Sequence, residues 1–456
     1  MKDYKEFLKS KEIHFSHSGF DVSEKSLNPL LKDFQVYAVK TALHKGKFAF
    51  FFDCGLGKTF CQLEWAHHVT RHTNSPVLIL APLAIVQQTI DEGEKFGIDV
   101  YKYDYECTPR ANEPGIFITN YDQLVNIDTS VFSGIVLDES SILKGRDGKL
   151  SSLIISSFRN TPYKLACTAT PSPNDHMELG QHSEFLGGMT YLEMLAMYFV
   201  HDGGETSKWR LRKHAEDDFW KYVCTWSMAI DTPVTLGFDG SGYDLPEIEY
   251  IEHIINVENN TQTLFGDVAV SATDLHKDLK RSFDERIKKT LELVNSNNEQ
   301  WIIWALSNAE TDTLKKLLPE AVNVQGSDKA EFKAKHLNGF AKNEFRTLIT
   351  KTSIAAMGMN YQNCHNMVFT SYDFKFEQFY QAVRRCYRFG QKHKVKVHLL
   401  VPSSQINVRA TILEKQENHF KMIKQMAKYS AFNDYKKNKP EREYKKAIIQ
   451  LPKFVS

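Results

Sequence analysis

The chain has 456 residues, which exceeds the usual size of one hydrophobic core, so two or three domains are expected. Its 42% hydrophobic and 25% charged residues are typical of an ordinary globular protein. The formal net charge of +1 excludes a protein-wide field that would attract nucleic acid or a membrane. The charge is uneven, however, because residues 392–456 contain fifteen Lys and Arg against five Asp and Glu. This basic C-terminal segment suits phosphate contact, and it equally suits a solvated helical surface.

The N-terminus and the cysteines indicate a cytosolic protein. The first residues, MKDYKEFLKSKEIHF, are charged throughout and contain no apolar signal core. No apolar run approaches the ~20 residues that span a bilayer, so no membrane partner is expected. The seven cysteines are scattered without C-x-x-C spacing, which indicates neither a zinc site nor a disulfide framework.

Residues 28–180 are predicted to form a first α/β domain, preceded by an extension over residues 1–27. Short apolar runs (KFAFFFDCG, VLILAP, GIFITNYDQL, SGIVLDES and YKLACTATP) alternate with segments of helical spacing. Buried strands of this length separated by helices predict a parallel sheet. Each run ends in polar or glycine residues, and ligands of open α/β sheets bind at these carboxyl ends.

The remaining chain predicts an insertion, a linker and a second domain. Residues 181–235 are rich in Trp, His and Met with helical patterning, which predicts a helical insertion. Residues 236–250 are rich in Gly, Asp and Pro and predict a linker. Residues 251–456 contain a second strand series (QWIIWAL, RTLITKT, NMVFTSY and KVKVHLLV) and the basic C-terminal segment. The predicted fold is therefore two α/β domains in tandem.

The stretch FFDCGLGKT ends one apolar run and opens a helical segment. Gly55 and Gly57 allow the backbone N–H groups to wrap a triphosphate. Lys58 would reach the β- and γ-phosphates, and the Thr59 hydroxyl would ligate Mg²⁺. The strict phosphate-loop pattern fails at its first glycine, where Phe52 stands. The alternative is a glycine turn with an incidental lysine.

Asp138 and Glu139 follow another apolar run, in IVLDESS. Two carboxylates leaving a buried strand are costly unless they serve a cation or a reaction, and the alternative is a solvated loop. Asp138 would hold Mg²⁺, while Glu139 would position and deprotonate an attacking water. This division of roles predicts a hydrolase rather than a kinase.

These stretches, taken in order, resemble the motifs of a superfamily-two helicase ATPase. LLKDFQVYAVKTAL resembles the adenine-reading glutamine motif, VLILAPLAIVQQT motif Ia, FITNYDQL motif Ib, DESS motif II and CTATPSPND motif III. WIIWALSNAETDTL resembles motif IV, TSIAAMGMNYQNCHNMVF motif V and QAVRRCYRFGQ motif VI. The last two resemble the Swi/Snf-type DNA translocase branch. DESSILKG, CTATPSPNDHMELGQHSEFLG and WRLRKHA resemble the compact version of this branch met in bacteriophage genomes. The resemblance covers residues 29–402 and implies two RecA-like domains with ATP in the cleft between them.

The resemblance completes the set of candidate site residues. The nucleotide-binding candidates are Gln35, Gly55, Leu56, Gly57, Lys58, Thr59 and Gly358, and the Mg²⁺ candidates are Thr59 and Asp138. The catalytic candidates are Lys58, Asp138, Glu139, Gln381, Arg385 and Arg388. Arg385 and Arg388 match arginine fingers, which reach across the cleft and complete the site when it closes. Arg384 occupies a variable position, and for it a surface or nucleic-acid contact stays open.

The resemblance also implies sequence-independent contacts with the DNA backbone. The candidates by motif position are Thr119, Asn120 and Tyr121 in the first domain, and Thr352 and Ser353 in the second. For each of them the alternative is a satisfied loop residue. The basic stretch SKWRLRKHA, residues 207–215, is a further DNA candidate or simply a structural surface. Ser141 departs from the family pattern, which leaves the contact between motifs II and III open.

The expected function is a Mg²⁺-dependent ATPase that is stimulated by DNA and translocates on duplex DNA. The alternative is a helicase that separates the strands of DNA or RNA. A nucleic-acid clamp without hydrolysis is disfavoured, because the ATPase residues are all present. We expect a monomer, since both halves of the ATP site lie in one chain, and a nucleoid-associated location in a bacterial or phage-infected cytoplasm. The sequence does not identify a recruiting protein.

Overall fold

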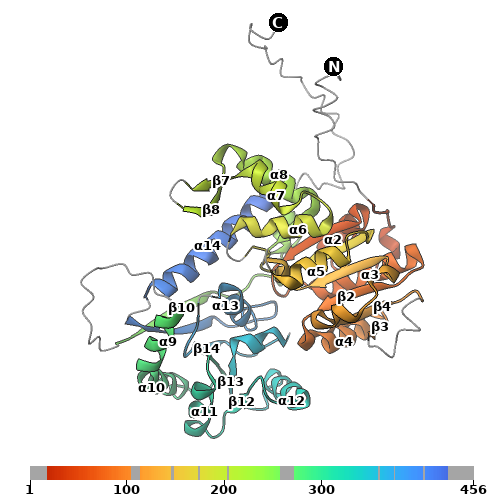
Figure 1. Cartoon of the computed structure of the whole chain (residues 1–456). Coiled ribbons are helices and arrows are strands. Elements are labelled where there is room, and N and C mark those ends of the chain that lie inside the picture. Colours follow the sequence, from red (N-terminus) through yellow and green to blue (C-terminus); the bar gives the residue numbers. More distant parts are fainter. Residues whose placement is uncertain are drawn as a thin grey trace, which may run out of the picture.

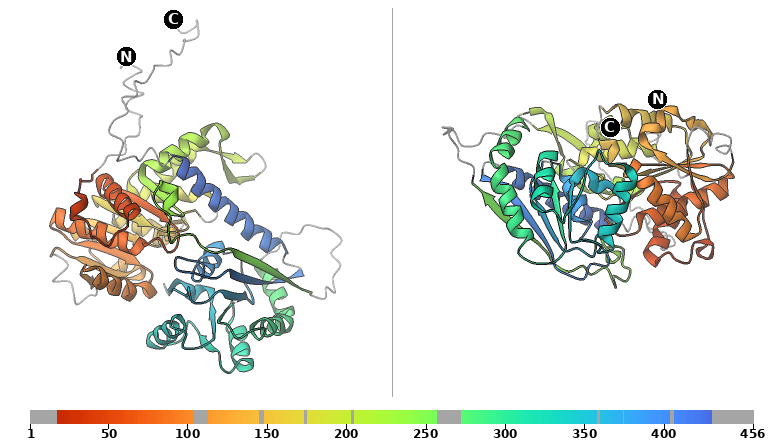
Figure 2. Two further views of the ribbon diagram at one scale, coloured as in Figure 1. Left: turned by 180° about the vertical axis from the view of Figure 1, so that it is seen from behind. Right: turned by 90° about the horizontal axis from the view of Figure 1, so that it is seen from below.

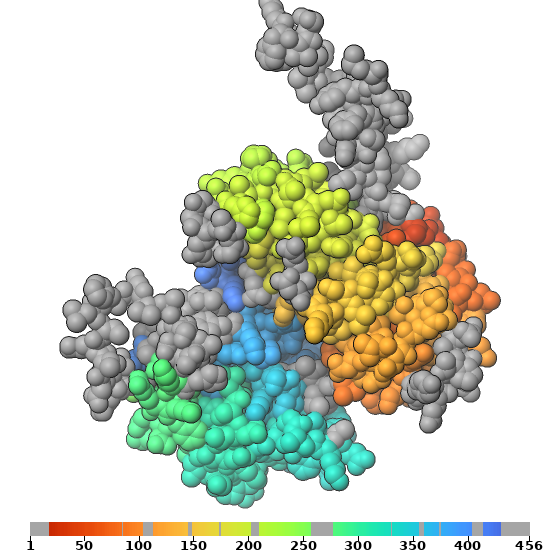
Figure 3. Space-filling view, viewed as in Figure 1, coloured from red at the N-terminus to blue at the C-terminus, as the bar shows by residue number. Residues whose placement is uncertain are grey.

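The computed structural model describes residues 18–103, 113–144, 148–172, 175–202, 205–256, 272–357, 360–373, 375–403 and 406–429. These residues form two α/β domains, a third part that lies on the first domain, and a long helix that connects them (Figure 1). In the space-filling view the three parts touch one another on this face of the molecule (Figure 3).

A parallel sheet with strand order β3-β4-β2-β5-β6-β1-β9 forms the centre of the first domain. Its strands are β1 (Lys47–Phe52), β2 (Val77–Ala81), β3 (Val100–Lys102), β4 (Ile116–Asn120), β5 (Gly134–Asp138), β6 (Tyr163–Cys167) and β9 (Ser227–Ile230). Its helices are α2 (Asp33–Lys45), α3 (Lys58–Thr73), α4 (Val86–Phe96) and α5 (Lys149–Ser157). β2, β5 and β6 are buried along their whole length, as expected for parallel strands covered on both faces.

A second parallel sheet, with strand order β10-β15-β14-β11-β13-β12, forms the centre of the second domain. Its strands are β10 (Ile248–Ile255), β11 (Trp301–Ala305), β12 (Val322–Val324), β13 (Thr347–Lys351), β14 (Asn366–Phe369) and β15 (Val395–Pro402). Its helices are α9 (Ala272–Arg281), α10 (Phe283–Val294), α11 (Asn308–Leu317), α12 (Ala330–Ala341) and α13 (Phe376–Val383). The predicted fold class, two RecA-like domains in tandem, is confirmed.

The segment predicted as a helical insertion contains strands as well as helices. Its helices are α6 (Leu179–Leu186), α7 (Tyr191–Tyr198) and α8 (Glu216–Trp226), and β7 (Phe199–Asp202) and β8 (Glu205–Leu211) form an antiparallel hairpin. β9 then pairs with β1 at the edge of the first sheet, with Ala49 opposite Ser227. The chain therefore returns to the first domain before it crosses to the second.

The end of the described chain also returns to the first domain. Helix α14 (Ile406–Tyr429) follows the second sheet and packs against α8 and β9, so that it runs from the second domain to α8 when seen from the front and from behind (Figures 1 and 2). Met422, Ile423 and Met426 of α14 are buried in the same hydrophobic cluster as residues of β5 and α8. Part of the basic C-terminal segment therefore joins the two domains. Residues 430–456 lie outside the described residues.

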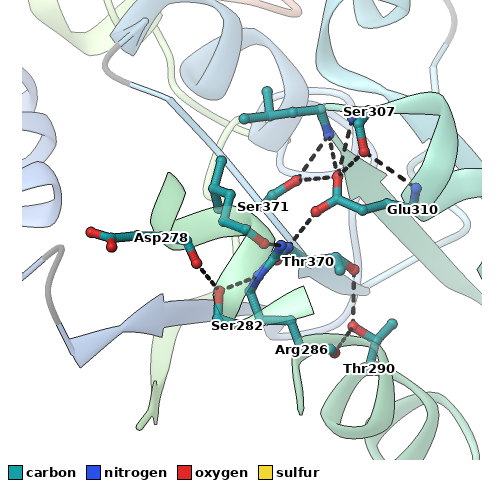
Figure 4. A network of polar contacts seen from close by, with 10 residues as sticks. Asp278, Ser282, Arg286, Thr290, Ser307, Glu310, Thr370 and Ser371 are labelled. Carbon is teal, nitrogen blue, oxygen red and sulfur yellow. Dashed lines mark hydrogen bonds and ion pairs between the residues drawn. The ribbon is translucent and has the colours of Figure 1, made fainter. Parts of the chain in front are cut away.

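A buried ion pair joins the strand ends of the second domain (Figure 4). Arg286 of α10 pairs with Glu310 of α11 and donates to the carbonyl of Thr370, at 2.7 Å, just after β14. Glu310 also accepts hydrogen bonds from the hydroxyls of Ser371, at 2.7 Å, and Ser307, at 3.0 Å. Both charged side chains are almost fully buried, so this network fixes the ends of β11 and β14 next to each other.

Candidate nucleotide site at the domain interface

The loop between β1 and α3 has the backbone conformation of a phosphate cradle. Gly55 and Gly57 have φ angles of 89° and 75°, which disfavour any residue with a Cβ. A Cβ at Gly57 would also lie 2.4 Å from Nε2 of Gln35. Lys58 begins α3, and its Nζ donates to the carbonyls of Phe52, at 2.8 Å, and Asp53, at 3.3 Å. The lysine ammonium therefore lies over the loop, beside the N-terminus of a helix, where anions bind.

Gln35 contacts this loop directly. Its Nε2 donates to the carbonyl of Leu56 at 2.9 Å, and its Oε1 accepts from the backbone N–H of Lys32 at 2.9 Å. Gln35 is buried, and both ends of its amide are engaged with the protein. The structure thus shows it supporting the loop, and the predicted contact with adenine stays a prediction.

Asp138 is the last residue of β5 and is buried. One of its oxygens accepts a hydrogen bond from Nε2 of Gln62 on α3 at 2.8 Å. Burial raises the pKa of Asp138, while the hydrogen bond from Gln62 and the nearby ammonium of Lys58 oppose this rise. The carboxylate is therefore held in a desolvated position beside the loop, where a cation would favour its charged form.

Glu139 has an unusual backbone conformation, with φ of 59° in the left-handed region. A glutamate rarely adopts this conformation, and such outliers cluster at functional sites. Its carboxylate accepts a hydrogen bond from the hydroxyl of Thr168, after β6, at 2.5 Å. This is a direct contact between motifs II and III, which the sequence left open. Burial, then repulsion from Glu377, raises the pKa of Glu139 to about 7.

The arginine-rich stretch of the second domain lies against the phosphate cradle of the first. A Cβ at Gly55 would lie 3.3 Å from the backbone nitrogen of Phe389 and 3.6 Å from Cβ of Arg388. The pKa of Arg388 is lowered to about 10, because its guanidinium is buried with Arg385 and Arg384 nearby. Nε of Arg385 is buried and has no hydrogen-bond partner among the described residues. The structure thus brings Arg388 to the loop, and it leaves Nε of Arg385 without a hydrogen-bond partner in the part of the chain that it describes.

Glu377, at the start of α13, makes a second contact between the domains. It accepts a hydrogen bond from the hydroxyl of Ser141 at 2.5 Å and pairs with Lys144. Ser141 and Lys144 lie two and five residues after Glu139. Ser141, where this sequence departs from the family pattern, therefore contacts the second domain.

These features fit ATP and Mg²⁺. The glycine cradle and Lys58 suit phosphates, and the buried partnerless Nε of Arg385 and the crowded guanidinium of Arg388 suit a further anion. Asp138 supplies the carboxylate that Mg²⁺ commonly takes beside phosphate oxygens. Thr59 lies one residue after Lys58 in the first turn of α3 and is partly exposed.

Two other nucleotide-site candidates gain no contact from the structure. Gln381 lies on α13 and is partly buried, and no hydrogen bond of its side chain is found within the described ranges. Gly358 lies outside the described residues.

The candidate DNA contacts are placed less favourably. Thr119 and Tyr121 are buried, and the Tyr121 hydroxyl donates to the carbonyl of Asp138 at 2.7 Å. Their burial leaves neither hydroxyl accessible to a phosphate in this structure. Tyr121 instead supports the end of β5. The side chain of Asn120 accepts from the backbone N–H of Asp122 at 2.9 Å and caps the following turn.

The second-domain candidates lie in the turn after β13, which packs against α13 and against the turn of residues 83–85 in the first domain. Thr352 is buried and Ser353 is exposed. Arg212, in the basic stretch, donates to the carbonyls of Met197 and Ala196, both at 3.2 Å, which supports the structural interpretation for this residue.

Several residues at the site were not predicted from the sequence. Gln62 lies one helical turn after Lys58, and Thr168 lies within the motif III stretch, so spacing offered a signal for both. Glu377, Lys144 and Asp53 had no such signal, because their partners lie more than 200 residues away in the sequence.

Two family models match the chain, one on each domain. Residues 21–173 match the model described as type III restriction enzyme, res subunit. Residues 285–390 match the helicase conserved C-terminal domain. The first match contains the phosphate cradle, Asp138 and Glu139, and the second contains Arg385 and Arg388.

Comparison with individual proteins gives local and distant similarities. A regulator of nonsense transcripts 1 from Takifugu rubripes is 32% identical over 125 residues, which are 27% of this chain and 11% of that protein. The SWI/SNF chromatin-remodeling complex subunit snf22 of Schizosaccharomyces pombe is 27% identical over 144 residues, 28% of this chain and 8% of that protein. This chain thus spans only a small part of these relatives. The solved ATPase core of Sulfolobus solfataricus SWI2/SNF2 with double-stranded DNA covers 88% of this chain and 95% of its own, at 14% identity and a TM-score of 0.44.

Proposed function

Because this chain belongs to the superfamily-two helicases, in the Swi/Snf-type branch of ATP hydrolases, we propose that it is a Mg²⁺-dependent ATPase that DNA stimulates and that translocates along duplex DNA. The observation that carries the proposal is the meeting of the phosphate cradle with the arginines of the other domain. Gly55 lies in contact range of Arg388, while Nε of Arg385 is buried without a partner. A site assembled from two domains ties hydrolysis to their relative motion.

The proposed mechanism gives each side chain one task. Lys58 and the loop N–H groups hold the phosphates, and Thr59 and Asp138 hold Mg²⁺, which when bound neutralises phosphate charge. Glu139 orients a water and accepts its proton, with Thr168 fixing its carboxylate at 2.5 Å. Arg385 and Arg388 stabilise the charge that develops on the γ-phosphoryl group, an effect on the order of 10³–10⁵ in rate.

Duplex DNA is proposed as the track, on the likeness of motifs V and VI to the Swi/Snf branch. The named Schizosaccharomyces pombe relative is a subunit of a chromatin-remodeling complex, which supports this choice. We further propose that the chain acts as a monomer in the cytoplasm. A location at the nucleoid and the likeness to bacteriophage proteins stay predictions. Within the described ranges, no helix combines the length and apolarity needed to cross a bilayer.

Translocation can be separated from unwinding with two substrates. One is a duplex with a short third strand bound in its groove, and the other is a forked duplex. We expect ATP-dependent displacement of the third strand without fork separation, and no displacement by Glu139→Gln. Separation of forked DNA or of duplex RNA at a comparable rate would favour the strand-separating helicase instead.

A further inference from the structure

A buried ion pair connects the phosphate cradle to the arginine stretch of the second domain. Asp53 immediately follows β1, and Arg384 is the residue after α13. Nε of Arg384 donates to Oδ1 of Asp53 at 3.1 Å, and Nη2 donates to Oδ2. The planar guanidinium thus binds the carboxylate through two parallel hydrogen bonds, which fixes orientation as well as distance.

The surroundings of this pair leave little freedom to either side chain. Oδ1 of Asp53 also accepts from the Tyr380 hydroxyl at 2.7 Å and from the backbone N–H of Cys54 at 2.6 Å. The guanidinium lies 5.7 Å from the ring centre of Tyr380 and 5.3 Å from that of Tyr387. The side chains of Asp53 and Arg384 are 10% and 11% exposed, so solvent screens their attraction only weakly.

The pair is positioned to control the two predicted arginine fingers. Arg384 directly precedes Arg385 and lies four residues before Arg388. Asp53 lies two residues before Gly55, which Arg388 approaches. Any separation of the domains must therefore break this ion pair in order to remove the fingers from the cradle. The sequence left Arg384 open between phosphate, nucleic acid and a surface, and its guanidinium is here committed to a carboxylate.

We propose that Asp53 and Arg384 are positioning residues. Their ion pair aligns the two domains when the cleft closes, and it thereby directs Arg385 and Arg388 toward the phosphates. Arg384 itself does not contact the nucleotide. This inference rests on the proposed ATPase function and adds to it the group that couples domain closure to assembly of the site. Tyr380 strengthens the pair by donating to the same carboxylate.

The role predicts a specific kinetic pattern. The nucleotide is held mainly by the first-domain loop, so loss of the pair should leave the KM for ATP within about threefold and lower kcat at least tenfold. The variants are Asp53→Asn, Arg384→Gln, their double variant, Arg384→Lys and Tyr380→Phe. Arg281→Gln is the matched control, since it removes an exposed arginine that pairs with Asp278 on α9, away from the candidate nucleotide site.

A double-variant comparison tests whether the two residues act as one unit. We expect the double variant to be no slower than the slower single variant, because each change removes the same interaction. Arg384→Lys should recover part of kcat, Tyr380→Phe should fall between the single variants and the wild type, and Arg281→Gln should match the wild type. If Arg384→Gln lowers kcat while Asp53→Asn does not, or if the two effects multiply, the proposal is overturned and Arg384 contacts the nucleotide. Unchanged kcat in both single variants also overturns it.

Domain closure provides a readout that does not depend on hydrolysis. Small-angle X-ray scattering with ADP and beryllium fluoride should show the wild type compact, and Asp53→Asn and Arg384→Gln more extended. Circular dichroism tests whether each variant is folded. If the charge variants do not fold, Tyr380→Phe, which removes only one hydroxyl, replaces them in the scattering experiment. If the wild type closes but shows no DNA-stimulated hydrolysis, the proposed function fails while the closure test stands. Equal compaction in all proteins contradicts the closure role.

Discussion

At the residue scale, the ionisation of Glu139, the proposed general base, should set the pH at which the site can work. Its pKa is raised to about 7, first by burial and then by repulsion from Glu377, against the opposing effects of Lys58 and Thr168. A general base must be ionised to accept a proton, so activity requires a pH above this midpoint. Glu139 is therefore held at the pKa that suits a base near neutral pH.

The ATPase activity should accordingly fall in acidic solution, by roughly tenfold per pH unit below the midpoint at which Glu139 titrates. Glu377→Gln should move the midpoint of kcat/KM to lower pH, because it removes the repelling charge. Lys144→Gln breaks the same ion pair but keeps the Glu377 carboxylate, so it should not lower the midpoint. Because Mg²⁺ bound beside Glu139 would itself lower the midpoint, the prediction is the difference in midpoint between the wild type and Glu377→Gln. Equal midpoints in these two proteins would contradict the role proposed for Glu139.

The residues at the carboxyl ends of β1 and β5 show how much of the site local sequence patterns predict. The spacing of Gly55, Gly57 and Lys58 after an apolar run, and of Asp138 and Glu139 after another, predicted a phosphate cradle with two carboxylates. The structure places them at the carboxyl ends of β1 and β5, two parallel strands of one sheet with β6 between them. The roles of these side chains stay predictions. The left-handed backbone of Glu139 had no sequence signal, because the surrounding fold imposes it.

At the scale of elements, long apolar runs predicted the central strands correctly, and short ones were missed. β9 has four residues and lies in a stretch with helical patterning, so only its pairing with β1 reveals it as a strand. The hairpin β7–β8 was missed for a similar reason, since polar residues interrupt it. Such long-range pairings depend on tertiary contacts that a local pattern does not contain.

Helix α14 should contribute to the stability of the first domain although it follows the second. Met422 is 1% exposed, and its sulfur accepts from the Ser172 hydroxyl at 3.0 Å. Met422→Ala should lower the free energy of unfolding by about 2–5 kcal/mol. Lys421→Ala, on the exposed side of the same helix, should change it by about 0.5 kcal/mol or less. Urea unfolding measures both, and equal effects would show that α14 is not a packed element.

Arg286 and Glu310 should stabilise the fold only when both are present. Burial raises the pKa of Glu310, but Arg286 and the hydrogen bonds outweigh this effect, so the net shift of the pKa is downward. The pair therefore stabilises the fold above about pH 4.5, and this stabilisation is lost in more acidic solution. At pH 7, Arg286→Met should lower the free energy of unfolding by about 3–5 kcal/mol, because it leaves a buried charge unpaired. Adding Glu310→Gln should restore part of this loss. A double variant less stable than Arg286→Met would contradict this interpretation.

At the scale of the whole molecule, contacts between residues far apart in the sequence hold the two domains together. Arg384 pairs with Asp53, Glu377 pairs with Lys144, and α14 packs into the core of the first domain. The sequence predicted that the domains meet across the nucleotide, and it did not predict these contacts, since their partners are far apart in the chain. Because α13 is anchored at both ends, its displacement would move Arg385 and Arg388 together.

In the proposed enzyme, both domains complete one ATPase site that DNA activates. The most direct test is the rate of ATP hydrolysis at fixed low salt without nucleic acid and with duplex DNA, single-stranded DNA or RNA, for the wild type, Glu139→Gln and Arg388→Ala. We predict strong stimulation by duplex DNA in the wild type, and a loss on the order of 10³ in both variants. Hydrolysis by Arg388→Ala at the wild-type rate, or no hydrolysis by the wild type under any condition, would contradict the claim.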